Sequence, residues 1–423
     1  MHYFEYKKNQ LYCEDVQIKK IGRKIGTPFY LYSYNTLTHH YKAFSTPFAS
    51  IPNLICYSVK ANSNLAVIKT FLSSGSGVDI VSGGELYIAI KAGADPKKIV
   101  FSGVGKRKDE IEYALKTGIL MFNVESEGEL YQIHNIAKNL KIQAGIALRV
   151  NPDIDPQTHP YISTGLKENK FGIDIKYAES LYYIAKDMDY IQILGIDCHI
   201  GSQLVKIEPF IDALDKVKNL IQKLKLKGIN IKYLDIGGGL GIPYDHEEPP
   251  HPKEYAKHII EHIKELNCTL IFEPGRVLVG NAGILVTKVL YLKKNGDKNF
   301  IIVDAAMNDL IRPSLYGSYQ NILPVNRKQE DSLSSSSPFI ADVVGPICES
   351  GDFLAKDRPL IMPDSEDLLA IMSCGAYGFS MSSNYNSRTK VPEIMVKGEK
   401  FFVIRKRESL EDLIKDEVNF EIF

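Results

Sequence analysis

The chain has 423 residues, of which 44% are hydrophobic and 24% charged, and its 51 basic side chains balance 51 acidic ones. This length and composition predict a globular protein of two domains with a substantial core. Because there is no basic excess and no block of like charge, nucleic acid is not an expected partner.

Strand-like apolar runs alternate with amphipathic helical stretches between about residues 54 and 276. The eight runs are Leu54–Val59, Val78–Ser82, Ile99–Ser102, Met121–Val124, Gly145–Val150, Ile191–His199, Tyr233–Ile236 and Leu270–Phe272. Stretches such as Ala66–Ser73 and Glu208–Lys227 have the spacing of helices that cover such strands. Eight alternating units predict a (β/α)8 barrel over residues 26–283, with a doubly wound open sheet as the alternative.

The pattern changes after residue 283, where pairs of short apolar runs flank polar turns. The pairs are Ile284–Leu292 with Phe300–Val303, around an Asn-Gly turn, and Ile394–Val396 with Phe401–Ile404. Such pairs are typical of hairpins. Residues 284–423 are therefore predicted to form a β-rich C-terminal domain, sandwich-like or barrel-like, and residues 1–25 a β segment that joins it. The fold class is α/β.

The six cysteines are scattered, without a CxxC pair or the spacing of zinc ligands, so we expect reduced thiols and no metal site. The first residues lack an apolar signal core. The uncharged stretch Leu368–Ser387 is interrupted by polar residues and is a poor membrane span. We expect a cytoplasmic protein without a membrane partner.

Lys60 follows the first apolar run directly, in Tyr57–Asn62. In strand–helix units the groups that do chemistry lie just past the carboxyl end of the strand. A partly desolvated lysine at that place loses its proton more easily and can form a Schiff base with an aldehyde. Alone, this pattern also fits an ordinary solvated lysine.

Other polar groups follow other runs. Gly237–Gly241 can bring backbone N–H groups close to an anion, although a glycine run can also be only a tight turn. Glu273 and Arg276 place a carboxylate and a guanidinium at the end of the eighth run, where a structural ion pair is the alternative. His199 and Asp79 fit either a site or buried structural roles. Their convergence at strand ends favours a common site.

These motifs resemble those of the fold type III pyridoxal-phosphate decarboxylases, in the same order along the chain. The matching segments are Tyr57–Asn62, His199–Ser202, Gly237–Gly241, Glu273–Arg276, Gly345–Asp352 and Gly375–Gly378. The resemblance covers nearly the whole chain and implies pyridoxal 5'-phosphate as the cofactor. It is nearest to the branch of the family that decarboxylates meso-diaminopimelate to L-lysine, the last step of lysine biosynthesis.

The resemblance implies that Lys60 carries the cofactor as a Schiff base, that His199 stacks on the pyridine ring, and that Asp79 supports the site. The phosphate is implied to be held by Ser202, Gly238, Gly239, the turn Glu273, Pro274, Gly275 and Arg276, and Tyr377. Glu273 is implied to face the ring nitrogen. A carboxylate there keeps that nitrogen protonated and makes the ring a strong electron sink, whereas the arginine typical of racemases of this fold would weaken it.

The resemblance also implies a homodimer in which Cys348 and Glu349 reach the active site of the other subunit. The thiol of Cys348 is a suitable acid for reprotonation after CO2 leaves, and a buried apolar cysteine is the alternative. The distal carboxylate of the substrate is implied to bind Arg276, Arg312 and Tyr316, and its distal ammonium Glu349. Tyr377 is implied to contact the substrate as well.

Two other functions are open to this sequence. The first is a related decarboxylase for another basic amino acid or for carboxyspermidine. Ornithine enzymes usually have aspartate where Glu349 stands, and arginine enzymes tend to be much longer. The second is a catalytically inactive regulatory relative. Such proteins usually lose the Schiff-base lysine or the cofactor contacts, all of which this chain has.

Overall fold

The structure is a computed structural model that describes residues 2–155, 169–327 and 339–418. The chain forms two compact units. One unit comprises Thr38–Leu278, and the other combines two distant segments, Met1–Leu37 and Val279–Phe423.

The unit Thr38–Leu278 is a closed ring of eight parallel strands. In ring order the strands are β5 (Asn53–Ser58), β6 (Gly77–Ile80), β7 (Ile99–Phe101), β8 (Met121–Val124), β9 (Ala144–Asn151), β11 (Ile191–Asp197), β12 (Tyr233–Asp235) and β13 (Thr269–Phe272). Strand β13 pairs with β5, and this pairing closes the ring. The predicted barrel is confirmed, and the open sheet is excluded. The short strand β10 (Ile173–Asp174) pairs with β9 beside the ring.

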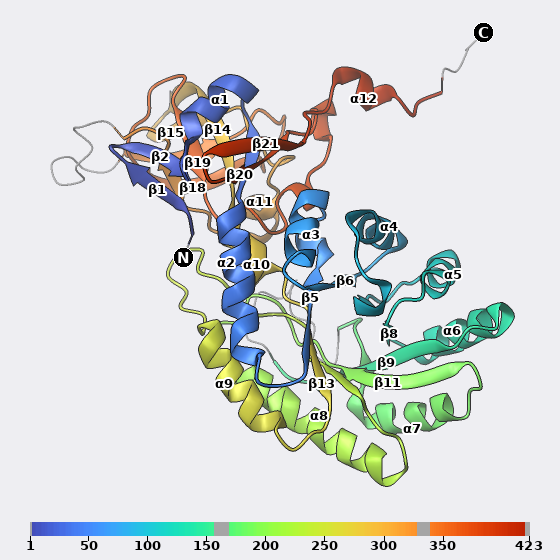
Figure 1. Cartoon of the computed structure of the whole chain (residues 1–423). Coiled ribbons are helices and arrows are strands. Elements are labelled where there is room, and N and C mark those ends of the chain that lie inside the picture. Colours follow the sequence, from blue (N-terminus) through green and yellow to red (C-terminus); the bar gives the residue numbers. More distant parts are fainter. Residues whose placement is uncertain (1, 156–168, 328–338, 419–423) are drawn as a thin grey trace. The chain divides into compact units, whose positions relative to one another are not determined.

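Helices alternate with the strands. They are α2 (Tyr34–Ser45), α3 (Leu65–Leu72), α4 (Gly83–Ala92), α5 (Lys108–Thr117), α6 (Glu127–Leu140), α7 (Ile175–Lys186), α8 (Glu208–Leu226), α9 (Pro252–Ile263) and α10 (Arg276–Val279). Figure 1 shows α4 to α9 outside the ring. Side-chain caps define several starts: Ser82 accepts from the amide of Glu85, and Ser126 from that of Glu129. Inside the ring, five strands contribute to a buried apolar cluster of Cys56, Val100, Met121, Ala147 and Ile271.

The second unit is rich in strands. Its main sheet has the order β18-β17-β15-β14-β4-β20-β21, and β19 joins it through β14. These strands are β4 (Phe29–Ser33), β14 (Gly283–Asn295), β15 (Lys298–Val303), β16 (Ile322–Pro324), β17 (Phe339–Val344), β18 (Phe353–Leu360), β19 (Leu368–Ile371), β20 (Glu393–Lys397) and β21 (Lys400–Arg405). The predicted hairpins are β14–β15 and β20–β21.

The amino-terminal residues of this unit form a small sheet of their own. It contains β1 (Phe4–Lys7), β2 (Gln10–Cys13) and β3 (Val16–Gln17). Helices α1 (Ile18–Ile25), α11 (Arg312–Tyr316) and α12 (Leu410–Ile414) complete the unit.

Strand β4 departs from the predicted boundary, because residues 26–37 were expected in the barrel. Instead β4 pairs antiparallel with β14 and parallel with β20. All five of its residues are buried. Phe29 and Leu31 pack into one apolar cluster, while Tyr30 and Tyr32 pack into another on the opposite face. A strand buried on both faces reads as an unbroken apolar run, and such a run does not tell which sheet it joins.

Among the helices that the structure describes, none is long and apolar enough to cross a membrane.

Candidate active site

Lys60 lies at the carboxyl end of the barrel strands, in a single 3₁₀ turn, Val59–Ala61, that follows β5. Its ammonium Nζ is 3.1 Å from Oδ2 of Asp79, which also accepts a 2.7 Å hydrogen bond from the hydroxyl of Ser58. Asp79 is fully buried, whereas the Lys60 side chain is 37% exposed. The buried carboxylate thus contacts the ammonium of a lysine whose side chain is partly exposed.

The turn at Glu273–Arg276 packs directly against the turn that carries Lys60. The carbonyl of Pro274 accepts a 3.1 Å hydrogen bond from the amide of Ser58. A Cβ on Gly275 would lie 3.0 Å from Cβ of Ala61, so a larger residue would push the two turns apart. The eighth strand end and the first strand end are therefore fixed to each other.

The glycine loop after β12 encloses His199. The amide of Gly238 donates a 3.2 Å hydrogen bond to Nδ1 of His199, which assigns the ring proton to Nε2. Burial, together with the nearby positive charges of Arg149 and Lys60, holds the pKa of His199 well below its usual value. The ring is thus neutral, with its Nδ1 bound to the loop.

Only glycine fits this loop. A Cβ on Gly237 would collide with the His199 ring, and one on Gly238 with the carbonyl oxygen of Glu273. A Cβ on Gly239 would lie 2.6 Å from the carbonyl oxygen of Gly201, and Gly239 has a φ of 101°. The loop therefore packs closely against His199, Glu273 and Gly201. A simple tight turn, the alternative considered from the sequence, would not need these contacts.

Arg276 is held by two side chains from neighbouring loops. Its Nη2 donates to the hydroxyl of Ser202 at 3.1 Å, and its Nη1 donates to the hydroxyl of Tyr244 at 2.6 Å. The guanidinium also lies 5.8 Å from the centroid of the Tyr244 ring. Arg276 is 4% exposed, so these contacts fix a buried cation at the barrel mouth.

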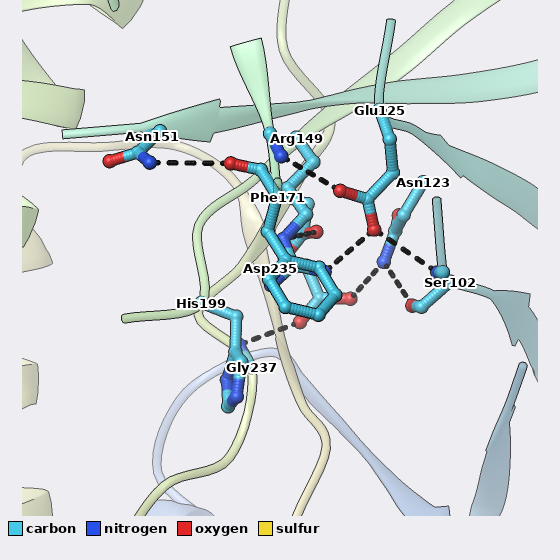
Figure 2. A network of polar contacts seen from close by, with 12 residues as sticks. Ser102, Asn123, Glu125, Arg149, Asn151, Phe171, His199, Asp235 and Gly237 are labelled. Carbon is cyan, nitrogen blue, oxygen red and sulfur yellow. Dashed lines mark hydrogen bonds and ion pairs between the residues drawn. The ribbon is translucent and has the colours of Figure 1, made fainter. Parts of the chain in front are cut away.

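Glu273 belongs to a buried polar network that includes Ser102, Asn123 and Asp235, which Figure 2 shows. Oε1 of Glu273 accepts hydrogen bonds from the hydroxyl of Ser102 at 2.9 Å and from Nδ2 of Asn123 at 3.1 Å. The same amide nitrogen of Asn123 is 3.2 Å from Oδ2 of Asp235. Glu273 thus takes its hydrogen bonds from strand-end residues on the far side of the barrel.

The network continues through Arg149 of β9. Arg149 donates to Oε1 of Glu125 at 2.7 Å and lies 3.8 Å from Asp197. Oε2 of Glu125 accepts from the amide of Gly172 at 2.8 Å, and the guanidinium of Arg149 lies 4.9 Å from the ring centroid of Phe171. These contacts attach the segment before β10 to the barrel mouth.

Burial raises the pKa of Glu273 to about 7, with a further rise from Asp79 and a partial offset from Lys60 and Arg149. Burial and their acidic neighbours also raise the pKa values of Asp197 and Asp235 well above their ordinary range. The ionised forms of Glu273, Asp197 and Asp235 are therefore all disfavoured by their surroundings. A cation brought against Glu273 would stabilise its ionised form.

In the strand-rich unit, Arg312 begins α11 beside two tyrosines. Its guanidinium lies 5.4 Å from the ring centroid of Tyr316 and 6.0 Å from that of Tyr377. Tyr377 has a φ of 56°, which is uncommon for a residue with a side chain. Arg312 is buried, with 6% of it exposed.

Cys348 and Glu349 lie in a loop of the same unit. Cys348 is exposed, so the alternative of a buried apolar cysteine is wrong. Its amide donates to Oδ1 of Asn386 at 2.8 Å, and Oε2 of Glu349 accepts from the hydroxyl of Tyr385 at 2.8 Å. Ser314 in α11 donates to the carbonyl of Gly351 at 2.6 Å, which ties this loop to the helix that starts with Arg312.

The structure thus brings the predicted barrel residues together, and the remaining predicted residues lie in the second unit. Sequence reasoning missed several polar residues of the barrel mouth: Ser102, Asn123, Glu125, Arg149, Asp197 and Tyr244. A signal was present for most of them. A polar or charged residue inside or directly after a buried apolar strand needs a partner, because burying it alone is costly.

Comparison with known proteins agrees with this geometry. Residues 34–280 match a family model described as "Pyridoxal-dependent decarboxylase, pyridoxal binding domain". A diaminopimelate decarboxylase from Vibrio cholerae is 51% identical over 98% of this chain and 98% of that protein, and one from Pseudomonas aeruginosa is 49% identical over 99% of each. The crystal structure of diaminopimelate decarboxylase from Helicobacter pylori complexed with L-lysine is similar, with a TM-score of 0.89, 46% identity, and coverage of 94% of this chain and 98% of that one.

Proposed function

This chain belongs to the pyridoxal-dependent decarboxylases, and on that premise we propose how its residues convert meso-diaminopimelate to L-lysine and CO2. The chain is a carboxy-lyase: relatives that match its whole length at about half identity carry the name diaminopimelate decarboxylase. They favour this function over a related basic amino acid or carboxyspermidine decarboxylase and over an inactive regulator. The observation that carries the mechanism is the Lys60–Asp79 pair beside the buried Glu273.

The residues at the barrel mouth fit pyridoxal phosphate. The buried Oδ1 of Asp79 has no hydrogen-bond partner among the residues that the structure describes, and the glycines of the loop after β12 pack so closely that none could carry a side chain. Such a bare backbone is the kind that can approach a phosphate closely. Lys60 would attach the cofactor through its amine, and Ser202 with the loops at Gly238–Gly239 and Glu273–Arg276 would hold its phosphate. The neutral ring of His199 suits stacking on an aromatic face. When bound, the cofactor supplies an electron sink for the pair of electrons that departing CO2 leaves behind.

Glu273 sets the strength of that sink. We propose that its carboxylate holds a proton at the pyridine nitrogen, because an anion there raises the pKa of that nitrogen. The hydrogen bonds from Ser102 and Asn123 favour the ionised form of Glu273 in this role.

Lys60 has a second task besides attachment. Its amine would trade places on the cofactor with the amine of the amino acid, leaving when the substrate binds and returning when the product is released. Asp79 accepts a hydrogen bond from Nζ and thereby orients the lysine for both exchanges. The hydroxyl of Ser58 shares this oxygen of Asp79 and fixes the carboxylate in turn.

Substrate selection rests on the distal end of meso-diaminopimelate, which carries a second ammonium and a second carboxylate. We propose that Arg276, Arg312 and Tyr316 bind that carboxylate, that Glu349 binds the ammonium, and that Tyr377 contacts both cofactor and substrate. Planar guanidinium groups can bind a carboxylate with two parallel hydrogen bonds. Lysine, ornithine and arginine lack the distal carboxylate.

We also propose that the protein works as a homodimer in the cytoplasm, with Cys348 and Glu349 acting in the site of the partner chain. The exposure of Cys348 supports this, because its thiol is available to a second molecule. Cys348 would then donate the proton that replaces CO2. The six free cysteines are typical of a reducing compartment.

The test is release of CO2 from meso-diaminopimelate, lysine, ornithine and arginine, each supplied separately to the loaded enzyme. We expect rapid release from meso-diaminopimelate and little from the other three. Lys60→Ala is the control and should abolish nearly all turnover, because it removes both the covalent anchor and the exchanging amine. Faster release from lysine or ornithine than from meso-diaminopimelate would contradict the proposed substrate.

A further inference from the structure

Two donors converge on one oxygen of Glu273. The hydroxyl of Ser102 is 2.9 Å from Oε1, and Nδ2 of Asn123 is 3.1 Å from the same atom. Figure 2 shows the side chains of Ser102 and Asn123 pointing toward each other, and their polar atoms are 3.0 Å apart. Both residues are buried at the ends of neighbouring strands, β7 and β8. Within the described ranges, both side-chain hydrogen bonds of Glu273 fall on Oε1.

The orientation of the Asn123 amide is set by its nitrogen. Nδ2 lies between Glu273 and Asp235, and it is the donor to both carboxylates. The other end of the same amide, Oδ1, is buried without a hydrogen-bond partner in the part of the chain that the structure describes. Leaving a buried acceptor unpaired is costly. Turning the amide over would bring its oxygen against an acceptor oxygen of each carboxyl group, so these two acceptors decide the orientation.

This arrangement fixes the rotation of the Glu273 carboxylate. Two donors from β8 and the residue after β7 hold Oε1, which leaves Oε2 for another partner. Each donor also stabilises the ionised form of the carboxylate. The contribution comes from neutral side chains, and it adds no charge to a cluster that already contains Asp79, Asp197 and Asp235.

We propose that Asn123 and Ser102 are positioning residues that hold Oε1 of Glu273 and so present Oε2 to the ring nitrogen of pyridoxal phosphate. This inference rests on the proposed function and deepens it, because it names the residues that act through Glu273. Asn123 and Ser102 touch neither cofactor nor substrate in this role. Their substitution should therefore weaken binding of a cofactor that has the ring nitrogen more than binding of one that lacks it. If their role were purely structural, both affinities would fall equally.

The test compares the affinities of the apoenzyme for pyridoxal phosphate and for 1-deazapyridoxal phosphate, which carries CH in place of the ring nitrogen. The wild-type protein should bind pyridoxal phosphate more tightly than the deaza compound. In Asn123→Ala this preference should fall by about tenfold, the factor that a hydrogen bond to a charged group contributes. Ser102→Ala should lower it less, because the Asn123 donor remains.

Ser76→Ala is the matched control. Ser76 is also buried in the barrel, and its hydroxyl donates to the carbonyl of Ile55 at 2.9 Å, away from Glu273. Its loss should leave the preference for the ring nitrogen unchanged, even where both affinities fall. Release of CO2 from meso-diaminopimelate is measured in parallel, so that failure of the proposed function is seen separately.

Equal losses of affinity for both compounds in Asn123→Ala would overturn the proposal and leave a structural role. If Asn123→Ala does not fold, Ser102→Ala decides by the same ratio, and an unchanged ratio there overturns the proposal. If the wild-type protein bound both compounds equally well, the proposed role of Glu273 would be wrong, and this inference would fail with it. Decarboxylation of meso-diaminopimelate is judged separately, by the release of CO2.

Discussion

Arg312 and Asp309 lie three positions apart in the strand-rich unit, and we expect their substitutions to act in different ways. Arg312 lies beside the rings of Tyr316 and Tyr377. Asp309 is buried and accepts a 3.0 Å hydrogen bond from the amide of Ala306. The first side chain is suited to a ligand, whereas the second closes a turn of its own chain.

Arg312→Met should damage turnover of meso-diaminopimelate through loss of contact with the distal carboxylate. Losing one bidentate, charge-assisted contact should cost on the order of 2–4 kcal/mol of transition-state binding, or roughly 30- to 1000-fold in kcat/KM. Lysine, which lacks that carboxylate, should be processed poorly by both proteins and change little. Steady-state kinetics with both compounds measures the difference.

Arg358→Met is the matched control for Arg312. Arg358 is also a buried arginine of this unit that stacks on a tyrosine, 3.7 Å from the ring centroid of Tyr319. Its loss should lower thermal stability without selectivity between substrates. Equal losses for both compounds in Arg312→Met would count against a recognition role.

Asp309→Asn should stabilise the protein, and more at high pH than at low pH. Burial raises the pKa of Asp309 from 3.8 to about 7. The folded state therefore binds the proton more tightly than the unfolded state, and stability falls as pH rises from about 4 to about 7. Asparagine does not titrate. Thermal unfolding at pH 5 and pH 8 should show a gain in Tm that is larger at pH 8, and a gain independent of pH would contradict the raised pKa.

The sequence predicts individual site residues where their role is encoded locally. Lys60, the glycine loop and the Glu273–Arg276 turn are contiguous motifs, and their spacing marks them. Asn123 and Tyr244 act through partners 150 and 32 positions away, so no local pattern distinguishes them from ordinary strand and loop residues. Their roles appear only when the ring brings distant strand ends together.

At the scale of elements, all eight strands of the ring start within one residue of their predicted starts, because the apolar runs mark them. The exception at element scale is β4, whose place in the other unit depends on pairing with β14 and β20. Helix starts depend on single capping residues. Ser126 at the start of α6 accepts a 3.2 Å hydrogen bond from the amide of Glu129.

Ser126→Ala should destabilise the barrel by about 1 kcal/mol, the usual cost of losing a side-chain cap. The amide of Glu129 would lose its partner at the first turn of α6. The matched control is Ser180→Ala in α7, where an exposed hydroxyl donates only to the carbonyl of Tyr177 within its own helix. Chemical unfolding should show a lower midpoint for Ser126→Ala alone, and equal effects would argue against the cap.

At the scale of the whole molecule, the proposed homodimer makes a prediction about mixed subunits. Lys60→Ala and Cys348→Ala should each be nearly inactive alone. If Cys348 serves the partner's site, a mixed dimer contains one intact site, and activity after random exchange should approach about one quarter of the wild-type value. Activity of the mixture, measured after exchange between tagged subunits is confirmed, tests this.

The control mixture combines Cys348→Ala with the double variant that lacks both Lys60 and Cys348. No intact site can form in that mixture, so it should stay inactive. Recovery there, or no recovery in the test mixture after confirmed exchange, would mean that the two residues do not act across a dimer interface.

The place of β4 in the middle of its sheet has a consequence for synthesis on the ribosome. This strand emerges early, whereas its neighbour β20 follows about 360 residues later, which corresponds to roughly 20 to 70 s of translation. Both of its hydrogen-bonding edges lack their final neighbours until β14 is made about 250 residues after β4, and the edge that pairs with β20 stays open for the whole interval. The nascent chain therefore carries an aggregation-prone strand while the barrel is made, and we expect it to need a chaperone until the last strands leave the ribosome.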